Sequence, residues 1–279
     1  MNFVKLNDLI NEAIERQNQR SQKIVLGRYG LNTDETKTLA ELGEGYDLTR
    51  ERIRQIQEVV MQALRAELTN HKEMTGFLKF LHGHLDKLGN LRPSHLLAKD
   101  IAAETGDPRY NEKVAMNRLH FIGELLNEPQ LSLTYGDNDW NDLWHNDPRA
   151  HSVAKKVVEH LLTFNEHDFD KFMSDAKDKF SLPEKVILNY LHSSKHFGNG
   201  PYGDLGADTW VHVNPKTARD KNYLVLKKVG KPLHFREIAS LVNSLPGIKP
   251  SHPDTIHNEL IKDDRFVLVG RGMYALKDQ

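Results

Sequence analysis

The polar residues that follow Thr49 are of the types that read the edges of DNA bases. Arginine can bind both major-groove acceptors of guanine, glutamine can bind adenine, and glutamate can accept a hydrogen bond from the cytosine amino group. The residues of this kind that would share one helix face are Arg50, Glu51, Arg54, Gln55 and Glu58. The chemistry indicated by this set is base recognition rather than catalysis.

A helix running from Arg50 to about Leu68 would place those side chains opposite an apolar stripe. Side chains three and four residues apart share a helix face. The stripe consists of Ile53, Ile56, Val60 and Leu64, and Thr49 is a typical N-cap residue. For an arbitrary helix, the ordinary interpretation of such a polar face is a solvated surface of i,i+4 ion pairs.

Three shorter helices are expected before this one. Leu6 to Ile14 carries an apolar stripe, Gln22 to Tyr29 ends at Gly30, and Thr38 to Leu42 is closed by Gly43 and Gly45. Glycine readily adopts the left-handed conformation that ends a helix. A helix, a glycine turn and a second helix are the layout of a helix-turn-helix.

The segments Ile24–Leu31, Thr38–Gly43 and Leu48–Ile56 together resemble region 4 of the bacterial sigma-70 family over residues 16–68. The resemblance implies a helix-turn-helix that reads the promoter −35 element and contacts the RNA polymerase β-flap. Gln57 stands where a glutamate is more usual. The residues then expected to contact DNA are Thr49, Arg50, Glu51, Arg52, Arg54 and Gln55. No segment resembles sigma region 2, so we expect no promoter melting.

The middle of the chain is predicted to be mostly helical. The expected helices are 77–88, 94–104, 113–126, 153–162, 168–180 and 183–192. Residues 89–93 and 106–108 are interpreted as helix breakers, 131–135 as a strand, 137–148 as a loop and 198–206 as a linker or ordered loop. A further winged-helix-like unit is one interpretation of this region.

The C-terminal part is predicted to be a winged helix-turn-helix, with helices at 220–229, 235–244 and 253–262 and a β-hairpin over 266–276. Residues 230–239, 257–261 and 265–276 resemble the HARE-HTH family, which implies binding to DNA or an adaptor role. The residues expected to face a groove are Ser251, His252, Thr255, His257 and Asn258, and those expected to meet phosphates are Lys249, Arg265 and Arg271. The alternative for His234 and Phe235 is a core or turn role.

Length and charge indicate several modules. The 279 residues suggest about two domains at roughly 150 residues each, and the patterns above favour segments 1–72, 73–214 and 215–279. The net charge is −1, but residues 221–279 carry ten basic and six acidic side chains. The fold class expected is mainly α, with an N-terminal helix-turn-helix, a helical middle region and a C-terminal winged helix with a small hairpin.

Other kinds of site find little support. The absence of cysteine excludes thiolate metal sites and disulfides. His82 and His84 lack a zinc-binding motif, and Asp137, Asp139 and Asp142 fit a solvated turn better than a calcium loop. The tryptophans expected in the core are Trp140, Trp144 and Trp210. We expect no catalytic residue, metal or cofactor, and no membrane association.

The sequence therefore predicts a non-enzymatic, DNA-binding transcription regulator of bacterial or phage type. We expect it in the cytoplasm, associated with the nucleoid, with double-stranded DNA and RNA polymerase as partners. Two alternatives are an RNA polymerase-bound adaptor that contacts mainly protein, and a DNA-binding component of a restriction or defence system. The sequence leaves the oligomeric state open.

Overall fold

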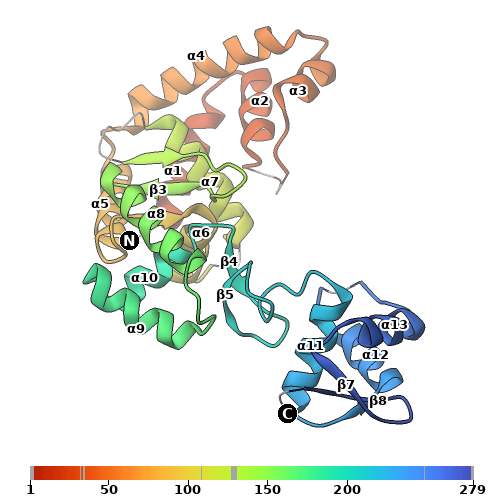
Figure 1. Cartoon of the computed structure of the whole chain (residues 1–279). Coiled ribbons are helices and arrows are strands. Elements are labelled where there is room, and N and C mark those ends of the chain that lie inside the picture. The colour runs from red at the N-terminus through yellow and green to blue at the C-terminus, as the bar shows by residue number, and fades with distance from the viewer. Residues whose placement is uncertain are drawn as a thin grey trace. The chain divides into compact units, whose positions relative to one another are not determined.

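Helices with small antiparallel sheets build the fold, as expected from the sequence (Figure 1). The computed structural model describes residues 3–31, 33, 35–107, 109–126, 131–247 and 249–277. The chain divides into two units, Met1–Lys155 with Leu188–Ser193, and Lys156–Ile187 with Ser194–Gln279. The predicted segments 1–72, 73–214 and 215–279 stay a prediction.

The first unit begins with α1 (Phe3–Glu15) and α2 (Gln19–Tyr29), each of which buries one apolar face. Asn18 caps α2, since its side chain accepts a hydrogen bond from the Ser21 N–H. Gly30 ends α2 with a φ of 61°, the left-handed conformation predicted for it. These two helices lie where the apolar periodicity placed them.

The turn of the helix-turn-helix lies between α3 (Leu39–Tyr46) and α4 (Arg50–Leu68). The expectation that Gly43 and Gly45 close α3 is wrong, because the helix continues to Tyr46 and is ended by Asp47, which has a φ of 52°. Gly43 serves a different purpose. A Cβ at this position would lie 2.6 Å from the Leu48 carbonyl oxygen, so only glycine allows the turn to approach α3.

A small apolar cluster holds these helices together. Ile24 of α2, Leu42 of α3 and Ile53 of α4 are all buried and pack against one another. Ile56, at the next position of the predicted stripe, is partly buried against them. The phase predicted for α4 is therefore confirmed, and its polar face points away from this cluster.

A second, larger core joins the N-terminal helices to the middle of the chain. Side chains of α1, α2 and α4 pack with those of α5 (Lys72–Asp86), α6 (Ser94–Thr105) and α7 (Glu112–Leu125). The helix-turn-helix is thus packed on a helical support within the first unit.

Three short strands complete the first unit, in the order β1 (Leu91–Pro93), β3 (Leu143–His145), β2 (Ser132–Thr134). β2 lies within the predicted strand 131–135. Residues 89–93 separate α5 from α6, as predicted, and β1 lies among them. The interpretation of 137–148 as a loop is wrong, because β3 lies there. Strands of three residues are too short to show an alternating pattern. Trp144 in β3 is buried, as predicted, whereas Trp140 is only half-buried.

The second unit contains α9 (Phe169–Phe180), while α8 (Pro148–Leu162) and α10 (Glu184–Leu191) each continue from one unit into the other. β4 (Phe197–Asn199) and β5 (Leu205–Ala207) pair as a hairpin. Of the two alternatives for 198–206, the linker is wrong, and the ordered loop is closer to the hairpin observed here. Its Gly206 has a φ of 159° and packs against the ring of Trp210, which is fully buried as expected.

The C-terminal elements follow the predicted order, with one added strand. They are α11 (Ala218–Val229), β6 (Leu233–His234), α12 (Phe235–Ser244), α13 (Pro253–Lys262), β7 (Phe266–Gly270) and β8 (Met273–Leu276). Their sheet has the order β6-β8-β7, and the elements share a core of their own. The sequence did not reveal β6, which has only two residues.

The element order of this C-terminal part also occurs in the first unit. The succession α5-β1-α6-α7-β2-β3 matches α11-β6-α12-α13-β7-β8, and both sheets place the first strand beside the third and the third beside the second. Exact repetition is absent from the sequence. The same topology is therefore built twice from dissimilar residues.

In the first unit, the third helix of this topology, α7, supports the helix-turn-helix. The Tyr29 hydroxyl donates to the Glu124 carboxylate and accepts from the Gln57 side chain at 2.9 Å. Arg65 of α4 donates to the main-chain carbonyls of Leu125 at 2.7 Å and Glu124 at 3.1 Å. A cation is favourable at this position, because the carbonyls at a helix C-terminus carry partial negative charge.

Two side chains of α7 extend this contact to the end of α2. Asn117 donates to the Gly30 carbonyl at 3.1 Å, and the buried Arg118 donates to the Leu31 carbonyl at 3.0 Å. Arg118 also donates to the Asn11 side chain at 2.9 Å. Burial lowers the pKa of Arg118 to about 10. These polar contacts supplement the apolar packing of α7 on the helix-turn-helix.

The Gln57 side chain, where the sigma-70 resemblance leads one to expect glutamate, is explained by these contacts. Gln57 donates to the oxygen of Tyr29, whose own proton goes to Glu124. A carboxylate at position 57 could not donate and would lie close to the Glu124 carboxylate. Burial and the same Glu124 raise the pKa of the Tyr29 phenol, so this residue stays a donor.

We predict that Ile53→Asp unfolds the helix-turn-helix, because an uncompensated buried carboxylate costs several kcal/mol. The matched control is Val59→Asp on the same helix, since Val59 is 67% exposed. Urea denaturation of both variants followed by circular dichroism, with hydrogen exchange of α2 to α4, measures the effect. Equal stability of the two variants would show that the helix phase is wrong.

We also predict that Gln57→Glu lowers the free energy of unfolding by about 1–3 kcal/mol at neutral pH. The introduced carboxyl should have a raised pKa in the folded state, because its charged form faces Glu124. The loss is then present at high pH and shrinks as the pH falls through that pKa. Gln57→Ala removes the same hydrogen bond without adding charge. Its loss should be pH-independent, and parallel pH profiles for the two variants would contradict the explanation.

Candidate nucleic-acid interface

The residues predicted to contact DNA in the N-terminal module lie together at the start of α4. All six are exposed, and they surround the first turns of the helix: Thr49, Arg50, Glu51, Arg52, Arg54 and Gln55. The buried Ile53 within the same stretch points toward α2 and α3. The structure thus presents the predicted set on one accessible end of a helix.

Thr49 gives this end of α4 its geometry. Its backbone is extended, with φ −70° and ψ 152°, and its hydroxyl accepts from the Arg52 N–H at 3.2 Å. The first amides of a helix carry partial positive charge and point along the helix axis. The start of α4 therefore combines amide donors with three arginine side chains, Arg50, Arg52 and Arg54.

The long side chains on this face form one hydrogen-bonded network. Arg54 donates to both Glu51 oxygens, at 3.0 and 2.9 Å, and Gln55 donates to Glu51 at 3.4 Å. Arg52 donates to the Gln55 side-chain oxygen at 3.1 Å. Glu51 thereby orients Arg54 and Gln55 together.

The charge of the network is also fixed by these contacts. The Arg54 guanidinium lowers the pKa of the Glu51 carboxyl, and Glu51 in turn raises the pKa of Arg54. Both groups therefore stay ionised at neutral pH. The polar face of α4 in the unbound protein is thus a solvated surface with ion pairs, which is the ordinary interpretation of such a face. Whether the same side chains recognise DNA bases is a separate question.

Two basic residues that the sequence analysis did not select lie at the connection between α2 and α3. Arg28 donates to the Lys37 carbonyl at 3.2 Å, and the Lys37 N–H donates to the Gly27 carbonyl at 2.9 Å. Lys37 is exposed and directly precedes α3, which Thr38 and Glu41 begin with a capping box. That capping box is visible in the sequence and marks the helix start.

The predicted C-terminal set is distributed around the start of α13. His252, Thr255 and Asn258 are exposed, while Ser251 and His257 are partly buried. His252 caps α13, accepting from the Asp254 N–H at 3.3 Å. The Ser251 main chain is held by the Asn243 side chain through bonds of 2.8 and 3.0 Å.

The remaining predicted DNA contacts of the C-terminal part differ in how far their side chains are engaged within the protein. The His257 ring stacks on Phe235 at 4.4 Å between centroids and meets the Tyr274 edge at 5.7 Å. Arg265 is bound to Asp263 at 2.7 Å and to Asp220 at 3.3 Å. Lys249 and Arg271 are exposed. Arg271 and Lys249 are thus better placed for phosphate contacts than Arg265.

The alternative role of His234 and Phe235 agrees with their surroundings. His234 caps α12, accepting from the Arg236 N–H at 3.3 Å, and Phe235 packs against the C-terminal core. Gly272, with a φ of 70°, lets the hairpin pass close to His234. These residues shape the base of the hairpin.

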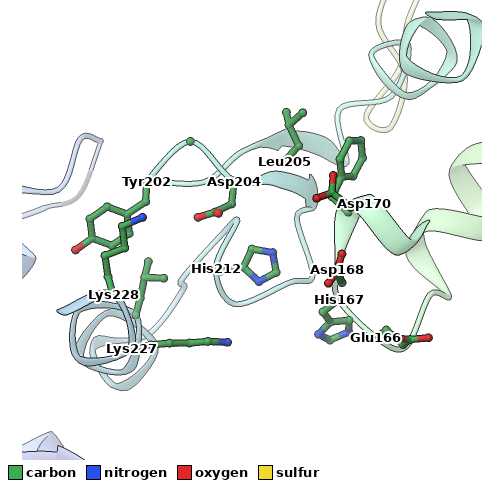
Figure 2. A pocket seen from close by; sticks show the side chains of 13 residues that line it. Glu166, His167, Asp168, Asp170, Tyr202, Asp204, Leu205, His212, Lys227 and Lys228 are labelled. Carbon is green, nitrogen blue, oxygen red and sulfur yellow. The ribbon is translucent and has the colours of Figure 1, made fainter. Parts of the chain in front are cut away.

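A hollow of about 700 Å³ lies in the second unit, before α9 and beside α11 (Figure 2). Glu166, Asp168 and Asp170 line one side, and Lys227 and Lys228 line the other (Figure 2). Several of these groups have structural tasks: Asp168 caps α9, and Lys228 lies over the Tyr202 ring. The hollow is open and lined by side chains of both charges, and this lining gives no indication of a specific ligand.

His84, one of the two histidines considered for metal binding, makes a different contact. His84 bonds to Asp100 at 2.8 Å, and Arg92 binds both oxygens of the same carboxylate at 2.9 Å. Arg92 also donates to Asn189 at 2.9 Å, which joins α10 to this cluster within the first unit. In the part of the chain that the structure describes, no group of three His, Asp or Glu side chains could hold a metal ion.

Among the described residues, no helix is both long and apolar enough to span a membrane.

Comparison with known proteins agrees with the N-terminal geometry. The chain is 35% identical over 63 residues to the RNA polymerase sigma factor RpoD of Neisseria gonorrhoeae, and 40% over 62 residues to RpoS of Coxiella burnetii. It is 39% identical over 56 residues to the principal sigma factor HrdD of Streptomyces viridifaciens. These matches cover 23%, 22% and 20% of this chain, but only 10%, 18% and 17% of the respective relatives.

The family model for Sigma-70, region 4 matches residues 13–66, which includes α2, α3, the turn and most of α4. The predicted resemblance over residues 16–68 is thereby confirmed, and the helix-turn-helix of this chain is similar to region 4 of the sigma-70 family.

Proposed function

We propose that this chain is a non-enzymatic transcription regulator of bacterial or phage type that reads duplex DNA through the first turns of α4. The carrying observation is the exposed set from Thr49 to Gln55 at the start of a helix whose opposite face is fixed by Ile53. The similarity of residues 13–66 to sigma-70 region 4 supports the same role.

The geometry suggests how binding would proceed. A major groove accommodates one helix, whose N-terminal side chains reach the base edges. The Arg54 and Gln55 side chains are held beside Glu51 before binding, so they lose less rotational freedom when they meet a base. Amides at the start of α4, and Lys37 before α3, would meet backbone phosphates.

We further propose that residues 218–277 form a HARE-HTH winged helix that adds a second contact. The three helices, the three-stranded sheet and the exposed residues of α13 support this assignment. Two linked modules on one DNA raise apparent affinity through effective concentration, without additional contacts at either module. The regulator would act in the cytoplasm on the nucleoid.

RNA polymerase is the proposed protein partner, with the β-flap as the contact of the helix-turn-helix. The relatives are named as RNA polymerase sigma factors, and the region they share with this chain is region 4. Since the resemblance does not extend to a melting region, the chain would bind promoter DNA without opening it.

We predict that Arg54→Ala and Gln55→Ala relax sequence preference, each costing about 1–3 kcal/mol on the preferred site. Binding to duplexes selected from a random library, and to scrambled versions, should be measured for each variant. Arg149→Ala is the matched control, since Arg149 is an exposed arginine paired with Asp147 at 2.8 Å, as Arg54 is with Glu51. Equal losses on preferred and scrambled duplexes would reject base reading by α4.

A second prediction concerns Arg271, which lies between Gly270 and Gly272 at the hairpin tip. Arg271→Ala should weaken binding almost uniformly across sequences and reduce the slope of log K against log salt by about 0.9. The measurement is DNA affinity at several salt concentrations, again with Arg149→Ala as control. An unchanged slope would favour the adaptor role for the C-terminal module.

A further inference from the structure

The outer strand of the C-terminal sheet has an unusual surface. In the order β6-β8-β7, strand β7 pairs with β8 on one side and forms an edge on the other. Three consecutive apolar side chains of β7 are exposed, Val267 at 37%, Leu268 at 60% and Val269 at 53%. Exposed apolar edge strands readily pair with other chains, so natural proteins seldom leave them open.

The backbone of β7 also has hydrogen-bonding groups directed outward. The Arg265 carbonyl accepts from the Lys277 N–H of the neighbouring chain segment at 2.9 Å. In an antiparallel pair, every second residue directs its backbone N–H and C=O toward the neighbouring strand. The backbone groups of Val267 therefore point toward β8, as the Arg265 carbonyl does, whereas those of Phe266 and Leu268 point away from it. The Phe266 N–H bonds to Asp263, which leaves the Phe266 carbonyl and both Leu268 groups on the free edge.

Two exposed cations lie near this edge, Arg271 after β7 and Lys277 after β8. The other two basic side chains of residues 262–277 are already paired with carboxylates, Arg265 with Asp263 and Asp220, and Lys262 with Glu259. A partner strand with both apolar and carboxylate side chains would complement the exposed apolar side chains of β7 and these cations.

We propose that the free edge of β7 binds an extended peptide of a partner protein in which apolar and acidic residues alternate, by strand addition. Main-chain hydrogen bonds at Leu268 supply affinity. Because successive side chains of a strand point to opposite faces, the apolar side chains of the peptide lie beside Leu268 on one face, and its acidic side chains lie on the other. The acidic side chains of the peptide meet Arg271 and Lys277. This protein contact goes beyond the DNA-reading function proposed for α4.

A second copy of the chain fits this edge less well. Antiparallel self-pairing centred on Leu268 would bring Arg265 of each copy opposite Arg271 of the other, and like charges directly opposite destabilise a strand pair. DNA fits less well too, because the outward carbonyls of Phe266 and Leu268 cannot donate to phosphate oxygens.

The test uses the full-length chain and a labelled, acetylated peptide of alternating glutamate and valine. A peptide of alternating lysine and valine is its control. Fluorescence anisotropy should show the acidic peptide binding at least about tenfold more tightly than the basic one. Hydrogen exchange should show protection of the Leu268 amide in the presence of the acidic peptide.

Variants locate the contact. Leu268→Pro removes an outward N–H at an edge position that tolerates proline, and should weaken binding about tenfold or more. Leu268→Ser keeps the backbone and should weaken binding several-fold, which covers the case that the proline variant fails to fold. Ile261→Ser is the matched control, because Ile261 of α13 is 63% exposed and lies off the strand, so its affinity should be unchanged.

Several results would overturn the proposal. These are equal affinity for the two peptides, no binding at peptide concentrations of about 1 mM, or protection outside residues 266–270. Concentration-dependent dimerisation that Leu268→Ser abolishes would assign the edge to a second copy. Because Arg271 is shared with the proposed DNA contact, competition is measured with the Arg271→Ala chain, and displacement of the acidic peptide from that variant by duplex DNA would assign the edge to DNA. Binding of DNA by α4 is measured separately, so either function can fail alone.

Discussion

The packing of α7 beneath the helix-turn-helix is the contact on which the proposed DNA-reading surface depends. Tyr29, Gln57 and Glu124 form a chain of hydrogen bonds from α4 to α7, and Arg65 binds the carbonyls at the end of α7. Apolar side chains of the same helices fill the space between. Buried polar groups are costly unless they are all satisfied, so such a contact permits few alternative arrangements. The direction of α4 within the first unit follows from it.

Local sequence suffices for the helices because their signals extend over many residues. The spans 235–244 and 253–262, the stop at Gly30 and the exposed face of α4 were all predictable from periodicity and capping. The strands β1 and β3 were not, since three residues carry too little pattern. Gly43 was misinterpreted as a stop, because glycine is required there by the close approach of Leu48 in the following turn.

In the candidate site, too, contacts between residues close in sequence could be predicted, whereas contacts between distant residues could not. The exposure of Arg54 and Gln55 follows from helix phase, and their bonds to Glu51 join residues three and four positions apart. The stacking of His257 on Phe235 and the pairing of Arg265 with Asp220 depend on the tertiary fold, so the sequence did not reveal these contacts. The departure at Gln57 became interpretable only with Glu124, 95 positions from Tyr29.

The core shared by α1, α2, α4 and α7 determines how the protein can be dissected. A fragment cut to the 54 residues of the family match would keep the α4 surface but uncover Tyr29, Val60 and Leu64, which are buried against the remainder of the first unit. Contiguous apolar surface of that kind promotes aggregation. The solubility of such a minimal fragment would therefore be limited by the apolar surface that normally packs on the rest of the first unit, whatever the affinity of the fragment for DNA.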